Sequence, residues 1–138
     1  MSSDTDGPGF GESAQRGFAL DDAVAFRRLM LDLYGDRCAV TGHADAGLEL
    51  FLFQPLAHGG PMGTGNAIVV EPAVKSLLEQ GLLLISDDYL AFMPHPEIIG
   101  GSAVPDAAQG HRIELPANVS LWPSRAMLAY HRSLFRAQ

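Results

Sequence analysis

Apolar residues follow a helical spacing in the first third of the chain. Four of them stand at positions i, i+3, i+4 and i+7, and an α-helix places such positions on one face. They are Phe26, Leu29, Met30 and Leu33. Asp21 and Asp22 precede this stripe, where acidic residues favour a helix N-terminus, and Gly35 follows it, where glycine favours a helix end. The pattern predicts an amphipathic helix from Asp21 that ends before Gly35.

A second helical pattern stands near the C-terminus. Pro123 suits a first helical position, because its ring fixes φ and it has no N–H to leave unpaired. An apolar stripe follows at helical spacing, so this segment is predicted to be a helix that packs on the core. The stripe consists of Met127, Leu128, Leu134 and Phe135.

The middle of the chain carries short apolar runs bounded by glycine, proline and polar residues, which is typical of strands. The predicted strands are 38–42, 48–53 and 111–115, and a hairpin is predicted over 82–85 and 89–93. Between 72 and 81 an initial proline, apolar residues on one face and a final glycine predict a short helix. Prolines and glycines in 54–65 predict a loop without regular structure, and 94–110 is predicted to be mostly loop.

Composition fits one globular domain. The chain has 138 residues, of which 47% are hydrophobic, enough to bury a real core. Residues 1–19 are rich in Gly, Ser and Asp and are predicted to be a flexible tail, so the domain is expected over 20–138. The sequence has neither a membrane-length apolar stretch nor a signal-peptide pattern, which predicts a cytoplasmic protein. Its one cysteine, Cys38, is expected to be a small buried hydrophobe.

The charge balance is acidic. Nine Lys and Arg against sixteen Asp and Glu give a formal net charge of −7, which disfavours attraction to nucleic acid phosphates. The nearest approach to a basic stripe is near the C-terminus, where a solvated helix face is the favoured interpretation. It comprises Arg125, His131, Arg132 and Arg136.

Three segments of the chain resemble a known family. The segments read FRRLMLDLYGDRCAVTG, then LELFLFQPLAHGGPMGTGN with a short helix and a hairpin, then PSRAMLAYHRSLF. From about Ala25 to the C-terminus this order is similar to the bacterial, restriction-associated HNH endonucleases. The resemblance implies an α+β fold, in which an antiparallel hairpin plus a short helix form an HNH-like ββα core flanked by N-terminal and C-terminal helices.

The same resemblance implies that the family's catalytic residues are replaced. It places Leu52 at the general base, Phe51 at the small or acidic position before it, Asn66 at the central asparagine and Lys75 at the last histidine, a metal ligand. A leucine cannot take a proton or bind an ion, and an ammonium group has no lone pair for a metal. We therefore expect a degenerate HNH-like site with no catalytic residue, no metal and no cofactor.

Lys75 and Asn66 have two interpretations each. Lys75 could supply a fixed positive charge that binds an anion, with Asn66 beside it. Glu71 and Glu79 stand four residues to either side of Lys75, so a solvated helix face with weak ion pairs is the favoured interpretation. Asn66 is equally explained as a cap at a loop-to-helix junction.

The histidines offer little metal chemistry by their spacing. His58 and His95 are the candidates for displaced metal ligands, and exposed loop positions are the favoured interpretation for both. His131 follows Leu128 on the last helix and is expected to have a hydrogen-bonded structural role. His43 has no partner at a meaningful spacing.

These observations favour a non-catalytic binding or interaction module, possibly homo-oligomeric, with a protein partner or self-association. The apolar side chains of Phe51, Leu52 and Phe53 would then fill the former site. Two alternatives remain open. One is an HNH-type endonuclease that uses a divalent metal held by displaced ligands such as His58, His95 and Asn66. The other is a nucleic-acid-binding protein that does not cleave, which the net charge disfavours.

Overall fold

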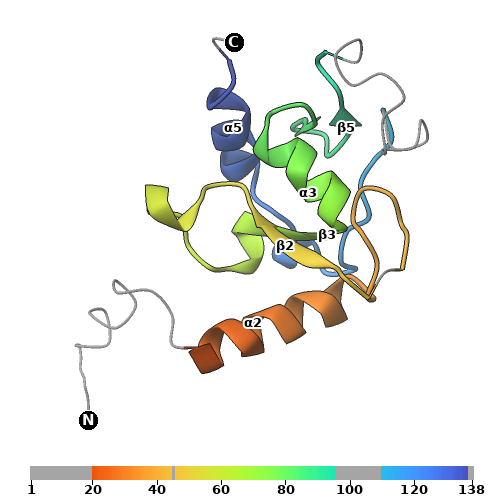
Figure 1. The fold of residues 1–138 in the computed structure, drawn as a ribbon, viewed down its shortest axis with the longest axis vertical. Helices are drawn as coiled ribbons and strands as arrows, with labels where there is room; N and C mark the ends of the chain where they lie inside the picture. The colour runs from red at the N-terminus through yellow and green to blue at the C-terminus, as the bar shows by residue number, and fades with distance from the viewer. Residues whose placement is uncertain (1–19, 45, 96–109, 137–138) are drawn as a thin grey trace.

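The computed structural model describes residues 20–44, 46–95 and 110–136, and the predicted tail over 1–19 lies outside this part of the chain. Its fold is α+β, with small antiparallel hairpins and helices, as the sequence predicted. In this part of the chain the strands form small antiparallel hairpins, and α-helices lie around them (Figure 1). No helix in the described ranges is both long and apolar enough to cross a bilayer.

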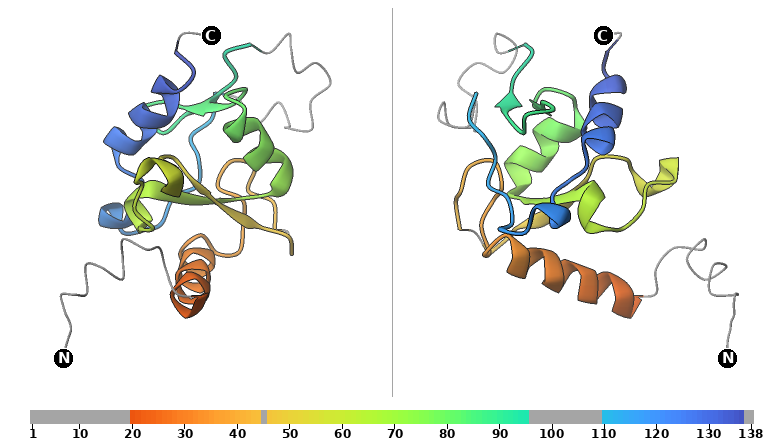
Figure 2. Two further views of the ribbon diagram at one scale, coloured as in Figure 1. Left: turned by 60° about the vertical axis from the view of Figure 1, so that its left-hand side comes forward. Right: turned by 180° about the vertical axis from the view of Figure 1, so that it is seen from behind.

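The centre of the fold is a ββα unit. Strand β2 (Glu49–Leu52) pairs antiparallel with β3 (Ala67–Val70), so that Phe51 lies opposite Ile68, and helix α3 (Pro72–Glu79) follows directly. Every residue of β3 is buried, since α3 and α5 (Arg125–Ser133) cover one face of the hairpin and α2 (Leu20–Leu33) lies against the other (Figure 2). This arrangement is compatible with the nuclease-like ββα core expected from the sequence.

Helix α2 (Leu20–Leu33) begins one residue before the predicted start. Met30 is fully buried and Phe26 and Leu33 pack partly on the core, but Leu29 is 46% exposed. The prediction that Leu29 belongs to the buried stripe is therefore wrong. Met30 and Tyr34, which follows the helix, belong to the buried core, whereas Leu29 does not.

The second hairpin formed as predicted but is shorter, with β4 at Leu84–Ile85 and β5 at Ala91–Phe92. Helix α5 (Arg125–Ser133) begins two residues after Pro123, because Ser124 is the N-cap and its hydroxyl accepts a hydrogen bond from the Met127 N–H. The predicted core stripe is also too long, since Leu134 is 37% exposed and lies beyond the helix end.

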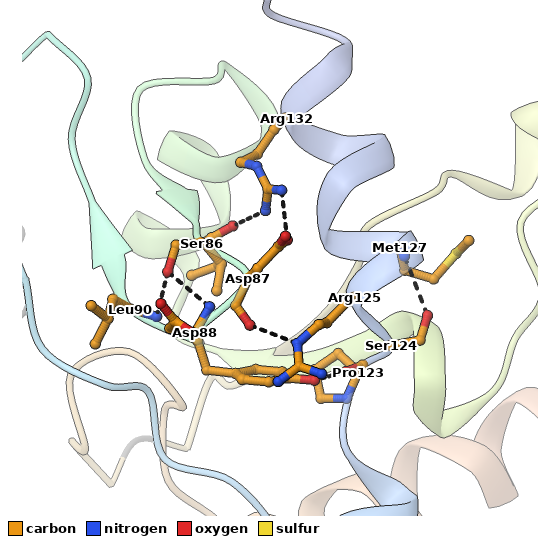
Figure 3. A network of polar contacts seen from close by, with 11 residues as sticks. Ser86, Asp87, Asp88, Leu90, Pro123, Ser124, Arg125, Met127 and Arg132 are labelled. Carbon is orange, nitrogen blue, oxygen red and sulfur yellow. Dashed lines mark hydrogen bonds and ion pairs between the residues drawn. The ribbon is translucent and has the colours of Figure 1, made fainter.

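Helix α5 is attached to the turn between β4 and β5 by arginine side chains (Figure 3). Arg132 donates to the Ile85 carbonyl at 2.7 Å and to the Asp87 carboxylate at 2.7 Å. Arg125 donates to the Asp87 carbonyl at 3.0 Å. The predicted solvated basic face is therefore only partly right: Arg125 and Arg136 are exposed, but His131 is buried and the partly exposed Arg132 joins the helix to the hairpin.

Two strand predictions and one loop prediction also need correction. Segments 38–42 and 111–115 form no strands. Segment 38–42 is a turn that lies between the two residues of an isolated bridge, Arg37 and Ala44, and segment 111–115 has one isolated bridge, Arg112 with Leu90. Segment 54–65 is not wholly irregular, since it contains the 3-10 turn η1 (Leu56–His58) and the start of η2 (Thr64–Asn66). A further 3-10 turn, η4 (Val119–Leu121), precedes α5. Most of the loop predicted over 94–110 lies outside the described residues.

Candidate functional site

An apolar groove of about 330 Å³ lies between β2, α3 and the end of α5. Of the four positions that the HNH resemblance assigns to the site, Phe51, Leu52 and Lys75 line the groove and Asn66 does not. Apolar side chains make up most of the wall. The lining residues are Leu50, Phe51, Leu52, Phe53, Pro55, Leu56, Lys75, Leu78, Glu79, His131, Leu134 and Phe135.

Buried aromatic rings form the inner wall of the groove. Phe51 and Phe53 project from the same face of β2, and their ring centroids are 5.2 Å apart in an edge-to-face arrangement. Both are buried, whereas Leu52 between them is partly exposed. At the predicted base and acidic positions the molecule therefore presents hydrocarbon, which can neither accept a proton nor hold a cation.

Lys75 forms an ion pair with β2. Its Nζ lies 3.1 Å from the Glu49 carboxylate, and both side chains are partly exposed. Glu71 is directed elsewhere, where it accepts a hydrogen bond from the Thr41 hydroxyl and lies 3.2 Å from Nδ1 of His43. The predicted ion pair between Lys75 and Glu71 is therefore wrong, and His43 does have a partner. Ion pairs between residues of separate elements cannot be predicted from helical spacing in the sequence.

Asn66 does not cap a helix, because it stands where a 3-10 turn enters β3 and is only 1% exposed. Its Oδ1 accepts from the Gln54 N–H at 2.9 Å, and its Nδ2 donates to the carbonyls of Gln54 at 2.9 Å and Pro61 at 2.8 Å. The capping interpretation is therefore wrong. Asn66 closes the loop after β2, and both of its amide donors are engaged within the protein. Lys75 lines the groove and Asn66 does not.

The candidate displaced ligands do not converge. His58 is exposed, as predicted, and its Nδ1 lies 2.8 Å from the Tyr130 hydroxyl, while His95 is exposed in a separate segment. Within the described ranges, no three His, Cys, Asp or Glu side chains are grouped so that they could hold a metal ion. The side chains at the site therefore do not fit the divalent metal that the HNH resemblance implies.

His131 has the structural role that the sequence predicted. It is 2% exposed, its Nε2 lies 2.7 Å from the Leu78 carbonyl, and the rings of Phe51, Phe53 and Phe135 surround it. Burial lowers the pKa of His131 and the charge of Arg132 lowers it further, while the hydrogen bond to Leu78 acts in the opposite direction. The imidazole is therefore neutral near pH 7 and behaves as part of the apolar wall.

No protein-family model matches this chain, and no curated protein matches it. Among solved structures, a modification-dependent TagI restriction endonuclease is similar, with a TM-score of 0.56 and 21% sequence identity. The similarity covers 78% of this chain and 36% of the endonuclease, so the chain spans about a third of that protein's length. The fold is therefore nuclease-like, and at this identity the likeness extends to the fold alone.

Proposed function

We propose that this chain is a non-catalytic module on a nuclease-like fold, and that it binds a protein partner through the groove beside β2. The observation that carries the proposal is the lining of that groove, where Leu52 and Phe51 present hydrocarbon and Lys75 is paired with Glu49. Hydrolysis of a phosphodiester on the HNH plan needs a base to deprotonate water and ligands to hold a cation. These side chains supply neither.

The charge distribution supports a protein partner rather than a nucleic acid. Arg125 and Arg132 are the cations nearest to a basic stripe, and both are engaged by the β4–β5 turn. The charge of Lys75 is offset by Glu49, which weakens the case for an anion site there. The net charge of −7 adds a general repulsion of phosphate backbones.

The alternative is a metal-dependent endonuclease, and the likeness of the fold to a restriction endonuclease is what favours it. A plasmid-nicking assay with Mg²⁺, Mn²⁺, Ni²⁺ or Zn²⁺ tests the choice. We expect no nicking above the background of a mock purification. Nicking that a chelator abolishes, and that a His58→Ala/His95→Ala variant lacks, would establish the endonuclease and overturn the proposal.

A further inference from the structure

The outer edge of β2 carries unpaired backbone groups. The Phe53 N–H donates to the Asn66 carbonyl at 3.0 Å, which continues the ladder in which Phe51 lies opposite Ile68. Hydrogen-bonded and non-hydrogen-bonded pairs alternate along an antiparallel ladder. The N–H and C=O groups of Leu50 and Leu52 therefore point away from β3, toward the outer edge.

Neighbouring contacts agree with this alternation. The carbonyl of Leu48, two residues before Leu50, also points outward and accepts from the Arg27 guanidinium at 2.8 Å. On the far side of the hairpin, the outward carbonyl of Val69 accepts from the Ala39 N–H at 2.7 Å. In the described part of the chain, the outward N–H and C=O groups of Leu50 and Leu52 have no such partner. Strand β2 faces the viewer in Figure 1, with β3 behind it.

This edge borders the apolar groove. Residues 50–52 of β2 and the following Phe53 form one wall, and α3 and the end of α5 form the other. Leu56 is 50% exposed and Leu134 is 37% exposed at its margins, so the groove offers apolar contact beside unpaired backbone. A strand that pairs with an open edge gains main-chain hydrogen bonds, while pockets for alternate side chains give specificity.

The charged residues of the groove favour a basic polypeptide segment as the partner of β2. Among the charged residues that line the groove, Lys75 is held by Glu49 while Glu79 is exposed. A basic side chain on the incoming segment would meet Glu79, whereas a second copy of this chain would bring another net charge of −7.

We infer that the outer edge of β2 accepts an extended segment of a partner polypeptide in which apolar and basic residues alternate. The segment extends the β2–β3 hairpin to three strands, and its apolar side chains enter the groove. This inference rests on the proposed function, because it names the class of partner for the same groove.

The probe is a fluorescein-labelled peptide of alternating valine and lysine, titrated with the full chain and followed by fluorescence anisotropy. In an extended peptide the N–H groups of alternate residues point to opposite edges. We expect N-methylation of one alternate set to weaken binding at least about tenfold, and N-methylation of the other set to leave it nearly unchanged. Equal effects of the two sets, or no binding of the parent peptide, would overturn the inference.

A protein variant tests the same edge. Leu52→Pro removes an outward N–H but no ladder bond, and proline is tolerated at such positions on edge strands. Leu52→Ala is the matched control, because it shortens the same side chain and keeps the N–H. Urea unfolding verifies that both variants are folded. We expect the affinity for the valine–lysine peptide to fall about tenfold further in Leu52→Pro than in Leu52→Ala. Equal losses in two folded variants would overturn the inference, and so would an unchanged affinity in Leu52→Pro.

Two further results separate the possible failures. If the chain neither binds the peptide nor nicks DNA with a metal, this inference alone is overturned. If the chain nicks DNA in a metal-dependent way, the proposed function is overturned as well. Sedimentation velocity of the chain is expected to show a monomer. A dimer that Leu52→Pro dissociates would assign the edge to a second copy and overturn the choice of partner.

Discussion

The Nε2–H of His131 on α5 donates a hydrogen bond of 2.7 Å to the carbonyl of Leu78 on α3. This contact satisfies a carbonyl near the helix end and joins the two helices that cover the hairpin. It also places a titratable ring among aromatic side chains, so that protonation of His131 opposes the folded state.

Stability is expected to depend on pH through His131. Its folded pKa is lowered below the ordinary 6.5, so the unfolded chain binds the proton more readily. The unfolding free energy is therefore largest above about pH 7 and falls as the pH drops through 6.5 toward the lower folded pKa. Urea unfolding between about pH 4.5 and 8, a range that extends to both sides of the ordinary histidine pKa, would measure how the unfolding free energy changes with pH.

Two variants serve as controls for the pH measurement. His131→Leu is expected to flatten the slope between about pH 5 and 6.5, because the buried imidazole is gone. His58→Gln removes an exposed histidine and is expected to keep the slope. A wild-type slope in His131→Leu would assign the pH dependence to other groups.

Asn66 is expected to stabilise the fold by closing the loop after β2 and not by capping a helix. Asn66→Ala leaves the Gln54 N–H and the Pro61 carbonyl without their partner, which costs about 2–4 kcal/mol of unfolding free energy. Asn118→Ala is the control, because Asn118 is an exposed cap of η4, and its loss is expected to cost under about 1 kcal/mol. Similar losses from the two substitutions in urea unfolding would contradict the account.

Gly81 is expected to resist substitution because of Phe135. Its φ is +73°, and an added Cβ would collide with the Phe135 ring that lines the groove. Gly81→Ala is therefore expected to cost about 2 kcal/mol or more, measured by urea unfolding, and to weaken binding of the valine–lysine peptide. Gly63→Ala, where an added Cβ meets open space, should change neither the unfolding free energy nor the peptide affinity by much. Equal stability of the two variants would contradict the close approach of Phe135.

Lys75 is expected to contribute little to stability and nothing to anion binding. Its ion pair with Glu49 is partly exposed, so Lys75→Ala should cost under about 1 kcal/mol of unfolding free energy. Because Glu49 offsets the ammonium charge, binding of inorganic phosphate or an oligonucleotide should be the same in the wild type and the variant. A clear loss of phosphate binding in Lys75→Ala would instead support an anion site at this position.

The elements that formed as predicted are those whose signals are local. The strand over 49–52, the helix after Pro72 and the turn of the second hairpin follow from apolar runs and from proline, glycine and serine at their ends. The exposure of Leu29 could not be predicted in this way, because helical spacing defines a face but not how much of it the core covers.

The candidate site was predictable in part. The resemblance located Leu52 and Lys75, and the structure places both in one groove. Glu49 could not be identified as the partner of Lys75, since the two are 26 residues apart and meet only when β2 packs against α3. The role of Asn66 was hidden for a similar reason, because its partners are backbone groups that the folded loop brings together.

The groove beside β2 is expected to hold no catalytic metal. Isothermal titration of the purified chain with Mn²⁺ tests this most directly, alongside a Leu52→His/Lys75→His variant that places two imidazoles at the positions the HNH resemblance identifies. We expect no saturable Mn²⁺ binding by the wild type and measurable binding by the folded variant. Stoichiometric binding by the wild type that His58→Ala/His95→Ala removes would contradict the account.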